Sequence, residues 1–530
     1  MGRVPMRRAA GSCAHTRGAR LAAWLLGVAL LLSACAHLGP PPARTVSTAL
    51  PGWEDTPWGR VVQESLPGDS TSGFALMPIG SVAYGARLEL AEHAQRTLDV
   101  QYYVLAKDAT GKRLMRALRD AARRGVRVRL LVDDVQTAGE DDMLAELAAE
   151  PHAEVRLYNP FPGARDSTVG RWIASWWDFH RVDHRMHNKL LVADNALAIF
   201  GGRNIGDAYF MQASDSNFLD LDVLAGGPVV RDLSRAFDAY WNSEFVYPIE
   251  TFAHPGPQVG GAILDEPAQG PLPGDDGPET DLLRRYSSTV RQLSEGRLAL
   301  ETAAMTVLFD PPDKAAGSKD RTRDGTVRGD LSAVVRSANE EVVVVSPYFV
   351  PGEEGVQAMR ALRARGVRLR LVTNSLAATD APLVHVGYAH YRQAMLRLGV
   401  EVREIGPGLV RQHSRLGSFG RSLGRLHAKV AVIDRRLVFV GSMNFDNRSE
   451  HRNTEIGVLI ESRELATEVL GLVDAERTSY RVRLAADGES LEWVYVDDGQ
   501  EAVWTDEPEA SLARRVQVRF LWPFVPEDEL

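Results

Sequence analysis

Short apolar runs alternate with amphipathic stretches from about residue 85 onward. The pattern predicts a helix over 86–94, a strand over 98–104, a helix over 111–124 and a strand over 126–132. Strands and helices that alternate along a chain are typical of α/β sheets covered by helices. We therefore expect an α/β fold.

The same order of elements recurs in the second half of the chain, with a strand predicted over 342–345, a helix over 355–365 and a strand over 367–373. The sequence GVRVRL, which starts at Gly125, is matched by GVRLRL, which starts at Gly366, an offset of 241 residues (366 − 125). The arginines of these two strands are expected at solvated edge positions: Arg127, Arg129, Arg368 and Arg370.

A second pair of matched segments has almost the same offset. The segment RMHNKLLVAD, 185–194, is matched by RLHAKVAVID, 425–434, at an offset of 240 (425 − 185). In both copies His and Lys are two apart, an Asp follows the Lys by five, and a glycine turn leads to an Asn fifteen residues after the Lys. Two separate landmarks with one period indicate a duplicated chain with two homologous halves.

The paired motifs offer chemistry suited to a phosphoryl group. Alternate side chains of an extended strand share a face, so His187 and Lys189 should point the same way, as should His427 and Lys429. Two imidazoles, two ammonium groups and the amides of the two Asn residues would then converge on one point. Phosphoryl transfer needs mainly positioning and charge stabilisation, which ammonium and amide donors supply. One histidine can attack phosphorus while the other protonates the leaving alcohol.

Each imidazole also needs a supporting acid. Glu455 stands at the start of an apolar strand, 456–460, in the second half. The corresponding strand in the first half, 221–225, is preceded by Asp220, and Asp222 is an alternative.

These motifs resemble the signature of the phospholipase D superfamily, H-x-K-x4-D followed by G-[GS]-x-N. Within that superfamily the chain is similar to the C-type bacterial cardiolipin synthases, through segments 98–103, 185–189, 201–210, 373–378 and 384–389. The resemblance implies two tandem phospholipase D-like α/β/α sandwich domains, packed with pseudo-twofold symmetry around one active site. It implies phosphatidyl transfer through a phosphohistidine, with no metal or other cofactor.

The resemblance also implies a role for each motif residue. His187 would be the nucleophile and His427 the general acid/base, with Asp220 and Glu455 orienting the imidazoles. The phosphoryl oxygens would be held by Lys189, Lys429, Asn204 and Asn444. Asp194 and Asp434 would be structural.

The first 35 residues differ from the rest of the chain. They contain five arginines and no acid, followed by an apolar run over 21–32, which is typical of a secretion signal. The signal ends Leu-Ser-Ala-Cys, which resembles a bacterial lipoprotein box whose lipidated residue would be Cys35. The alternative is an uncleaved anchor or an ordinary signal with a chance cysteine. We expect a lipoprotein of the bacterial cell envelope on the periplasmic side, and Ala36 in place of Asp favours the outer membrane.

The net charge and the cysteine content limit which binding partners and which metal or disulfide sites are expected. Loss of the five leader arginines takes the formal charge from −9 to −14 (−9 − 5), which argues against a nucleic-acid partner. The expected partners are phospholipid substrates and a membrane surface, and no protein partner can be deduced. Cys13 and Cys35 are the only cysteines, so the mature chain is expected to contain no disulfide and no thiolate metal site.

We divide the chain as follows: leader 1–35, tether 36–75, first phospholipase D-like domain 76–253, Pro/Gly linker 254–280, second domain 281–480 and C-terminal extension 481–530.

Two features outside the motifs have two interpretations each. Trp172, Trp176, Trp177 and Phe179 form either a core-packing helix or an aromatic rim at a membrane interface, and the cluster over 520–524 is treated alike. The arginine-rich stretch 411–425 forms either a solvated loop or a lid that attracts anionic head groups. His385 and Tyr388 are possible substrate-side residues.

The predicted function is cardiolipin synthesis from phosphatidylglycerol and a second phospholipid. Phospholipase D hydrolysis to phosphatidic acid is the alternative, because the same residues serve both reactions. A nuclease and a non-catalytic lipid-binding lipoprotein are less well supported, because of the negative charge and the two intact motifs.

Overall fold

The computed structural model describes residues 38–254, 262–265, 281–316, 325–417, 419–473 and 475–521. The predicted leader, with Cys35, and most of the predicted linker 254–280 lie outside the described residues. No helix within the described ranges is long and apolar enough to cross a bilayer.

Each half of the chain builds a mixed sheet with the same strand order. In the first half the order is β9-β4-β3-β2-β5-β6-β8-β1, where β2, β3 and β4 run parallel and the other neighbours antiparallel. The bounds are β1 (Ser72–Met77), β2 (Thr97–Tyr102), β3 (Arg127–Asp133), β4 (Ala153–Tyr158), β5 (Leu190–Ala193), β6 (Leu197–Gly201), β8 (Asp222–Gly226) and β9 (Val246–Pro248).

In the second half the order is β13-β12-β11-β15-β16-β17-β10, again with a parallel trio, β11, β12 and β13. The bounds are β10 (Glu301–Phe309), β11 (Glu341–Val345), β12 (Arg368–Asn374), β13 (Glu401–Ile405), β15 (Val430–Ile433), β16 (Leu437–Gly441) and β17 (Ile456–Glu461). Three further strands extend its far edge: β18 (Ser479–Leu484), β19 (Leu491–Asp497) and β20 (Gln500–Trp504).

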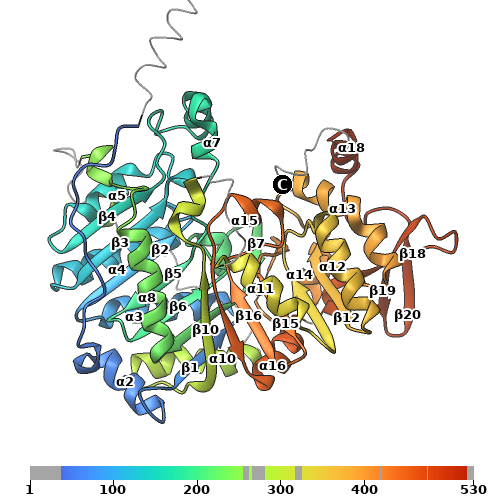
Figure 1. Cartoon of the computed structure of the whole chain (residues 1–530), viewed down its shortest axis with the longest axis horizontal. Coiled ribbons are helices and arrows are strands. Elements are labelled where there is room, and N and C mark those ends of the chain that lie inside the picture. The colour runs from blue at the N-terminus through green and yellow to red at the C-terminus, as the bar shows by residue number, and fades with distance from the viewer. Residues whose placement is uncertain are drawn as a thin grey trace, which may run out of the picture.

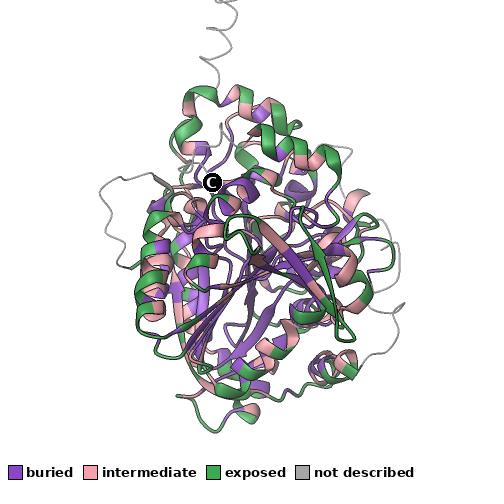
Figure 2. Ribbon diagram, turned by 90° about the vertical axis from the view of Figure 1, so that its right-hand side faces the viewer, coloured by how far each residue is buried: buried purple, intermediate pink, exposed green. Residues whose placement is uncertain are grey.

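The two sheets join at the middle of the molecule, where β1 pairs with β10 (Figure 1). The result is one continuous sheet whose two halves repeat each other. Most of its strands are buried (Figure 2), whereas β10 at the junction is largely half-buried or exposed. A smaller two-stranded sheet, β7 (Ser216–Leu219) with β14 (Leu423–Leu426), also connects the halves. The predicted fold class, two phospholipase D-like halves around a shared centre, is confirmed.

The helices of the first half are η1 (Trp53–Asp55), α2 (Pro57–Ser65), α3 (Gly80–His93), α4 (Ala109–Arg123), η2 (Asp134–Gln136), α5 (Asp141–Ala148), α6 (Thr168–Ala174), η3 (Trp176–Asp178), α7 (Phe179–Val182), η4 (Asp207–Phe210), α8 (Pro228–Trp241), η5 (Ile249–Thr251) and α9 (Ala262–Asp265). Those of the second half are α10 (Asp281–Ser294), η6 (Pro312–Ala316), α11 (Val327–Arg336), α12 (Gly352–Ala364), α13 (Pro382–Arg397), α14 (Pro407–His413), α15 (Asn447–His451), α16 (Arg463–Val473), α17 (Ala475–Thr478) and α18 (Leu512–Leu521).

Helix α4 shows why these segments fold as they do. The Asp108 side chain accepts a hydrogen bond from Gly111 N at 2.9 Å and caps the first turn. Leu114, Leu118 and Ala121 repeat at helical spacing and are fully buried. The helical and strand patterns predicted from the sequence correspond to α3, β2, α4, β3, β11, α12 and β12, with ends shifted by a few residues.

Two predictions about the first half are wrong. The arginines of β3 are not all solvated, because Arg129 is fully buried and pairs with Asp99 at 2.6 Å and Asp238 at 2.8 Å. β3 lies inside the sheet, and two carboxylates neutralise the arginine there. Its second-half equivalent, Arg370, is partly exposed, as expected.

The predicted tether over 36–75 is also largely folded. Helix α2 buries Trp58 and Val62, and β1 begins at Ser72. The backbone of Ser47 accepts a hydrogen bond from Arg129 at 2.9 Å, so the preceding irregular segment is attached to the first half as well. The predicted boundary at 480/481 falls inside β18.

Candidate active site

The two motif segments lie against each other's half of the molecule. Just before His427, β14 pairs in parallel with β7 of the first half, and His427 N donates to Leu219 O at 2.8 Å. Just before Lys189, His187 N donates to Thr454 O of the second half at 2.9 Å. Each motif histidine is therefore hydrogen-bonded through its backbone to the segment that carries the other half's acid.

This crossing places His187 beside Glu455. His187 Nδ1 lies 2.9 Å from Glu455 Oε2, and both side chains are buried. Two serines hold the carboxylate from behind: Ser449 Oγ donates to Glu455 Oε1 at 2.8 Å, and Ser442 Oγ donates to Oε2 at 2.5 Å. With both oxygens engaged, the carboxylate has a fixed orientation toward the imidazole.

The other histidine has the mirror arrangement. His427 Nδ1 lies 2.6 Å from Asp220 Oδ2. Asp222, the alternative acid, instead pairs with buried Arg87 at 2.8 Å, so the geometry selects Asp220. A Cβ on Gly202 would come within 2.0 Å of Asp220 Oδ1, which explains why glycine stands where the second half has Ser442.

The two lysines lie with the histidines. Lys189 Nζ donates to His187 O at 2.6 Å, and Lys429 Nζ donates to His427 O at 2.5 Å. Each ammonium therefore uses one donor on the backbone and has further N–H groups for another acceptor. His and Lys precede β5 and β15 rather than lying within them, which differs from the strand placement expected from the pattern.

The two asparagines are both buried but differ in their contacts. Asn204 Oδ1 accepts from Val104 N at 3.2 Å, and its Nδ2 donates to the hydroxyl of Tyr209 at 2.9 Å. Asn444 Oδ1 is buried with no partner in the described part of the chain. A buried amide oxygen that accepts no hydrogen bond lowers the stability of the fold. This oxygen belongs to the Asn that ends the second motif turn.

The motif aspartates hold the backbone instead of facing the site. Asp194 accepts from the backbone N–H groups of Gln95, Arg96 and Thr97 at 2.7–3.1 Å, at the start of β2. Asp434 does the same for 339–341, at 2.8–3.1 Å, at the start of β11.

Burial and charge distinguish the two imidazoles. Burial lowers the pKa of His187 well below its usual value, and the Lys189 and Lys429 cations act in the same direction. The charge of His427 acts in the same direction. Burial raises the pKa of Glu455 to about 7.

The acid beside His427 behaves differently. Burial alone would raise the pKa of Asp220, but the His427 and Lys429 cations outweigh it and lower that pKa to about 2. Burial lowers the pKa of His427, and ionised Asp220 opposes this. Burial lowers the pKa of Lys429 to about 8. The two acids therefore differ: the pKa of Asp220 is lowered and that of Glu455 is raised.

Aromatic rings that the motif analysis missed pack on both imidazoles. The ring of Tyr103 meets His187 edge-on at 4.9 Å, and those of Tyr209 and Phe218 lie 5.2 and 5.0 Å from His427. Asn374 holds the second motif segment by exchanging two hydrogen bonds with the backbone of Leu426, both 2.9 Å. Tyr103, Tyr209 and Asn374 lie in the segments that carried the subfamily resemblance, which was the available signal.

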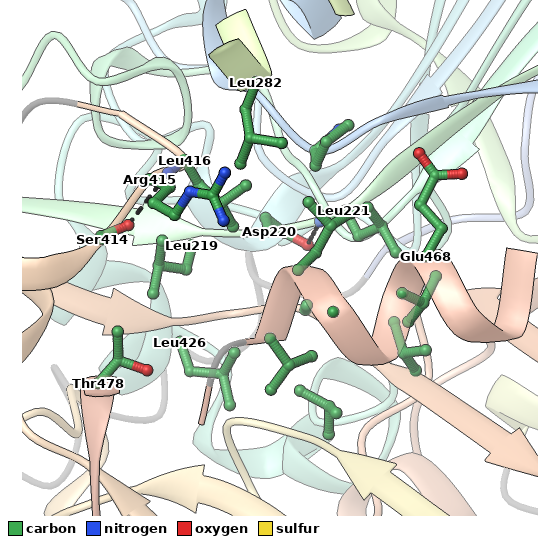
Figure 3. Close-up of a pocket in the computed structure, with 18 of the residues that line it drawn as sticks. Leu219, Asp220, Leu221, Leu282, Ser414, Arg415, Leu416, Leu426, Glu468 and Thr478 are labelled. Atoms are coloured by element: carbon green, nitrogen blue, oxygen red, sulfur yellow. Dashed lines mark hydrogen bonds between the residues drawn. The ribbon is translucent and has the colours of Figure 1, made fainter. Parts of the chain in front are cut away.

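A cavity of about 290 Å³ lies behind Asp220, between α10, α16 and the turn after α14 (Figure 3). Its lining is mainly apolar, with Leu219, Leu221 and Leu426 around the Asp220 carboxylate. The motif histidines and lysines do not line it. It therefore meets the site only through Asp220.

Two other predicted features have clear positions. His385 and Tyr388 face a buried network, where Tyr388 donates to Glu404 at 2.7 Å and Arg392 donates to Glu507 at 2.9 Å. This network joins α13 to the C-terminal extension, so it supports a structural rather than a substrate-side role. The core-packing interpretation of the tryptophan cluster holds for Trp172, which packs on Phe161 at 5.2 Å, and is wrong for Trp176 and Trp177, which are 70% and 71% exposed.

Among the residues that the structure describes, no group of three or more His, Cys, Asp and Glu side chains is placed to hold a metal ion.

Comparison with known proteins agrees with this geometry. Residues 88–241 and 331–475 match the family described as "Cardiolipin synthase, PLD-like domain". Cardiolipin synthase C of Escherichia coli (strain K12) is 39% identical over 448 residues, which is 82% of this chain and 92% of that protein. Cardiolipin synthase A of Pseudomonas fluorescens is 25% identical over 414 residues, or 78% of this chain and 70% of that protein.

Among solved structures, a phosphatidylserine synthase from Haemophilus influenzae shares the fold, with a TM-score of 0.55 at 12% identity over 89% of this chain and all of that one. Two homologous halves, one shared centre and the extent of these matches lead to one conclusion: the chain belongs to the phospholipase D superfamily, in the family of cardiolipin synthases with phospholipase D-like domains.

Proposed function

We propose that this protein transfers a phosphatidyl group between phospholipids, making cardiolipin from phosphatidylglycerol and a second phospholipid. The observation that supports this most is the crossed pair of buried histidine–acid contacts, His187 with Glu455 and His427 with Asp220. The similarity to cardiolipin synthase C, over most of both chains, supports the choice of lipid.

In the first step, Nε2 of His187 attacks the phosphorus of the donor lipid, because Nδ1 is occupied by Glu455. A P–N bond forms, the P–O bond to the leaving alcohol breaks, and His427 gives its proton to that alcohol. The low pKa of His187 favours the neutral, nucleophilic imidazole. Burial lowers the pKa of His427 as well, but ionised Asp220 opposes that lowering and stabilises the imidazolium that donates the proton.

In the second step, His427 takes the proton from the terminal hydroxyl of phosphatidylglycerol. The resulting oxygen attacks phosphorus, the P–N bond breaks, and His187 is released unchanged. Lys189 and Lys429 stabilise the negative charge on the phosphoryl oxygens in both steps, and Asn204 and Asn444 contribute amide donors. Asp194 and Asp434 act only by holding the backbone.

The finer parts of the proposal concern location. We propose that Cys35 is lipidated and that the protein is attached to the periplasmic side of the bacterial cell envelope. Mass spectrometry of the mature N-terminus tests this directly. An unmodified Cys35, or an N-terminus at another residue, would contradict it.

The activity is tested with purified protein in EDTA, given phosphatidylglycerol with and without phosphatidylethanolamine. Cardiolipin as the product supports the proposal. Phosphatidic acid alone would instead indicate a phospholipase D, which uses the same residues with water as acceptor. Cleavage of DNA with no lipid product would indicate a nuclease.

A further inference from the structure

A group of large apolar side chains is exposed just before the first motif. Within α6, η3 and the start of α7, five residues are 44–71% exposed: Val169, Ile173, Trp176, Trp177 and Phe179. Contiguous exposed apolar surface on a protein marks an interaction site. Together with the outward face of α18, described below, these residues are called the apolar end of the molecule.

Hydrogen bonds on the buried side of this segment fix it to the rest of the protein. Arg171, on the opposite side of α6, is buried, and its Nη1 donates to Asp134 O at 2.5 Å and Thr137 Oγ1 at 3.0 Å. The Ser167 side chain caps the helix by accepting from Gly170 N at 3.0 Å. The exposed face is therefore a fixed part of the fold.

The same segment is connected to the active site through ring contacts. Phe179 packs on Trp172 at 5.8 Å, Trp172 on Phe161 at 5.2 Å, and the guanidinium of Arg185 lies 5.1 Å from the Phe161 ring. Arg185 is two residues before His187. The exposed face is therefore linked to the first motif in two ways: it is near in sequence, and a series of packed rings connects the two.

Helix α18 provides a second face of the same kind. Leu512 and Val516 are 76% and 58% exposed and four residues apart, so they lie on one side of the helix. Val518, on the other side, packs against α13 and the loop before it. Figure 1 places α7 and α18 at the same end of the molecule, on its two halves, and Figure 2 shows exposed helices there.

The charge on α18 identifies what this end would touch. The helix has three arginines and no acid, in a chain whose formal charge is −9 overall. Arg514 donates to Thr379 O and Arg515 pairs with Asp506 at 3.5 Å, so Arg519 is the arginine of this helix that is offered to an anionic surface. Amphipathic helices with an apolar face and flanking arginines lie in the interface of membranes that contain anionic lipid. Tryptophan is also enriched at the level of the lipid head groups.

We propose that the apolar end of the molecule, formed by α6–α7 and α18, docks onto a bilayer of anionic phospholipid. The inference rests on the proposed function in one respect, since a bilayer is where lipid substrates of this enzyme reside. Docking through both halves would present the shared active site to the membrane surface.

The first test measures insertion without turnover. The full chain with Cys13→Ser and Cys35→Ser receives one environment-sensitive fluorophore, at Ile173→Cys or Leu512→Cys, with Val496→Cys as the control. Val496 is 53% exposed on β19, away from the apolar end. With phosphatidylglycerol vesicles we expect emission at 173 and 512 to rise about threefold and to be quenched by brominated acyl chains, with no change at 496.

Unchanged emission at 173 and 512 would overturn the proposal, as would an equal signal with phosphatidylcholine vesicles. A signal at 173 that depends on protein concentration without vesicles would indicate a second copy instead. Because the label reports contact and not catalysis, failure of the proposed function would leave this result unaffected.

The second test measures turnover on two forms of one lipid. Trp176→Ser/Trp177→Ser should lower turnover of phosphatidylglycerol in vesicles about tenfold, since docking is weakened. Turnover of short-chain phosphatidylglycerol dissolved as monomers should remain within about twofold of the parent. Equal loss on both forms, or no loss on vesicles, would contradict the docking role.

Discussion

His187 Nδ1 lies 2.9 Å from Glu455 Oε2, although 268 residues separate them and they belong to different halves of the duplicated chain. The reciprocal contact joins His427 to Asp220. Neither half therefore contains a complete histidine–acid pair, and the proposed active site is assembled where the halves meet. This explains why the two halves are joined both by the continuous sheet and by the β7–β14 pair.

The two motif histidines should act as one unit. We expect His187→Ala or His427→Ala to lower turnover by about 10³-fold or more, with the double variant little worse than either. After an acid quench of the reaction with phosphate-labelled phosphatidylglycerol, label should be bound to the parent chain and absent from His187→Ala. Label on His187→Ala, or substantial turnover in either variant, would contradict the assignment.

The crossed contacts predict which substitutions are coupled. The His187→Gln and Glu455→Gln effects on the free energy of unfolding should be non-additive by about 0.5–3 kcal/mol, because the residues are in contact. The pair His187→Gln and Asp220→Asn should be closer to additive. Chemical denaturation of the single and double variants measures this. Stronger coupling of His187 to Asp220 than to Glu455 would contradict the crossed arrangement.

Gly202 and Ser442 occupy equivalent positions in the two halves. There is no room for a side chain at Gly202, whereas the side chain of Ser442 donates a hydrogen bond to Glu455. Gly202→Ala should lower turnover about 10²-fold, because the new Cβ would displace Asp220 from His427. Ser442→Ala removes one of two serine donors to Glu455 and should have a smaller effect, about tenfold. Steady-state kinetics on both variants tests the order, and a larger loss in Ser442→Ala would refute the steric argument.

The activity should fall as pH rises through about 8. Lys429 stabilises phosphoryl charge only when protonated, and burial lowers its pKa to about 8, so kcat/KM should decline above that pH. A bound phosphate raises the pKa of a neighbouring ammonium, so the decline in kcat should occur at higher pH. In Lys429→Arg the basic limb should move upward or vanish, and an unchanged limb would exclude Lys429 as its source.

The motif aspartates should affect stability and not chemistry. Asp194→Ala leaves three backbone donors near β2 without an acceptor, which should lower the free energy of unfolding by about 2–4 kcal/mol. Asp434→Ala should cost less, because the N–H groups at 339–341 are more accessible to water. Turnover per folded molecule should remain near that of the parent in both, as denaturation and active-site titration would show.

Much of this protein is determined by its sequence alone. The spacing of apolar residues predicts α4, β3 and β12, because that spacing decides whether a segment buries its apolar side chains as a helix or as a strand. The two motifs predict His187, Lys189, His427 and Lys429 as the catalytic residues, because the spacing of His and Lys is the same in both copies. The duplication follows from two offsets that differ by one residue.

Tertiary structure decided what depends on which segments meet. The sequence proposes Asp220 and Glu455 as acids, but only contacts between the halves assign each acid to the opposite histidine: the pairing of β14 with β7 for Asp220, and the bridge of Met186 with Thr454 for Glu455. Arg129 is buried because Asp99 and Asp238, far away in sequence, neutralise it. Trp176 and Trp177 are exposed because Arg171 fixes the other side of α6 to the body of the protein. Long-range contacts set burial and pairing, and no local pattern contains them.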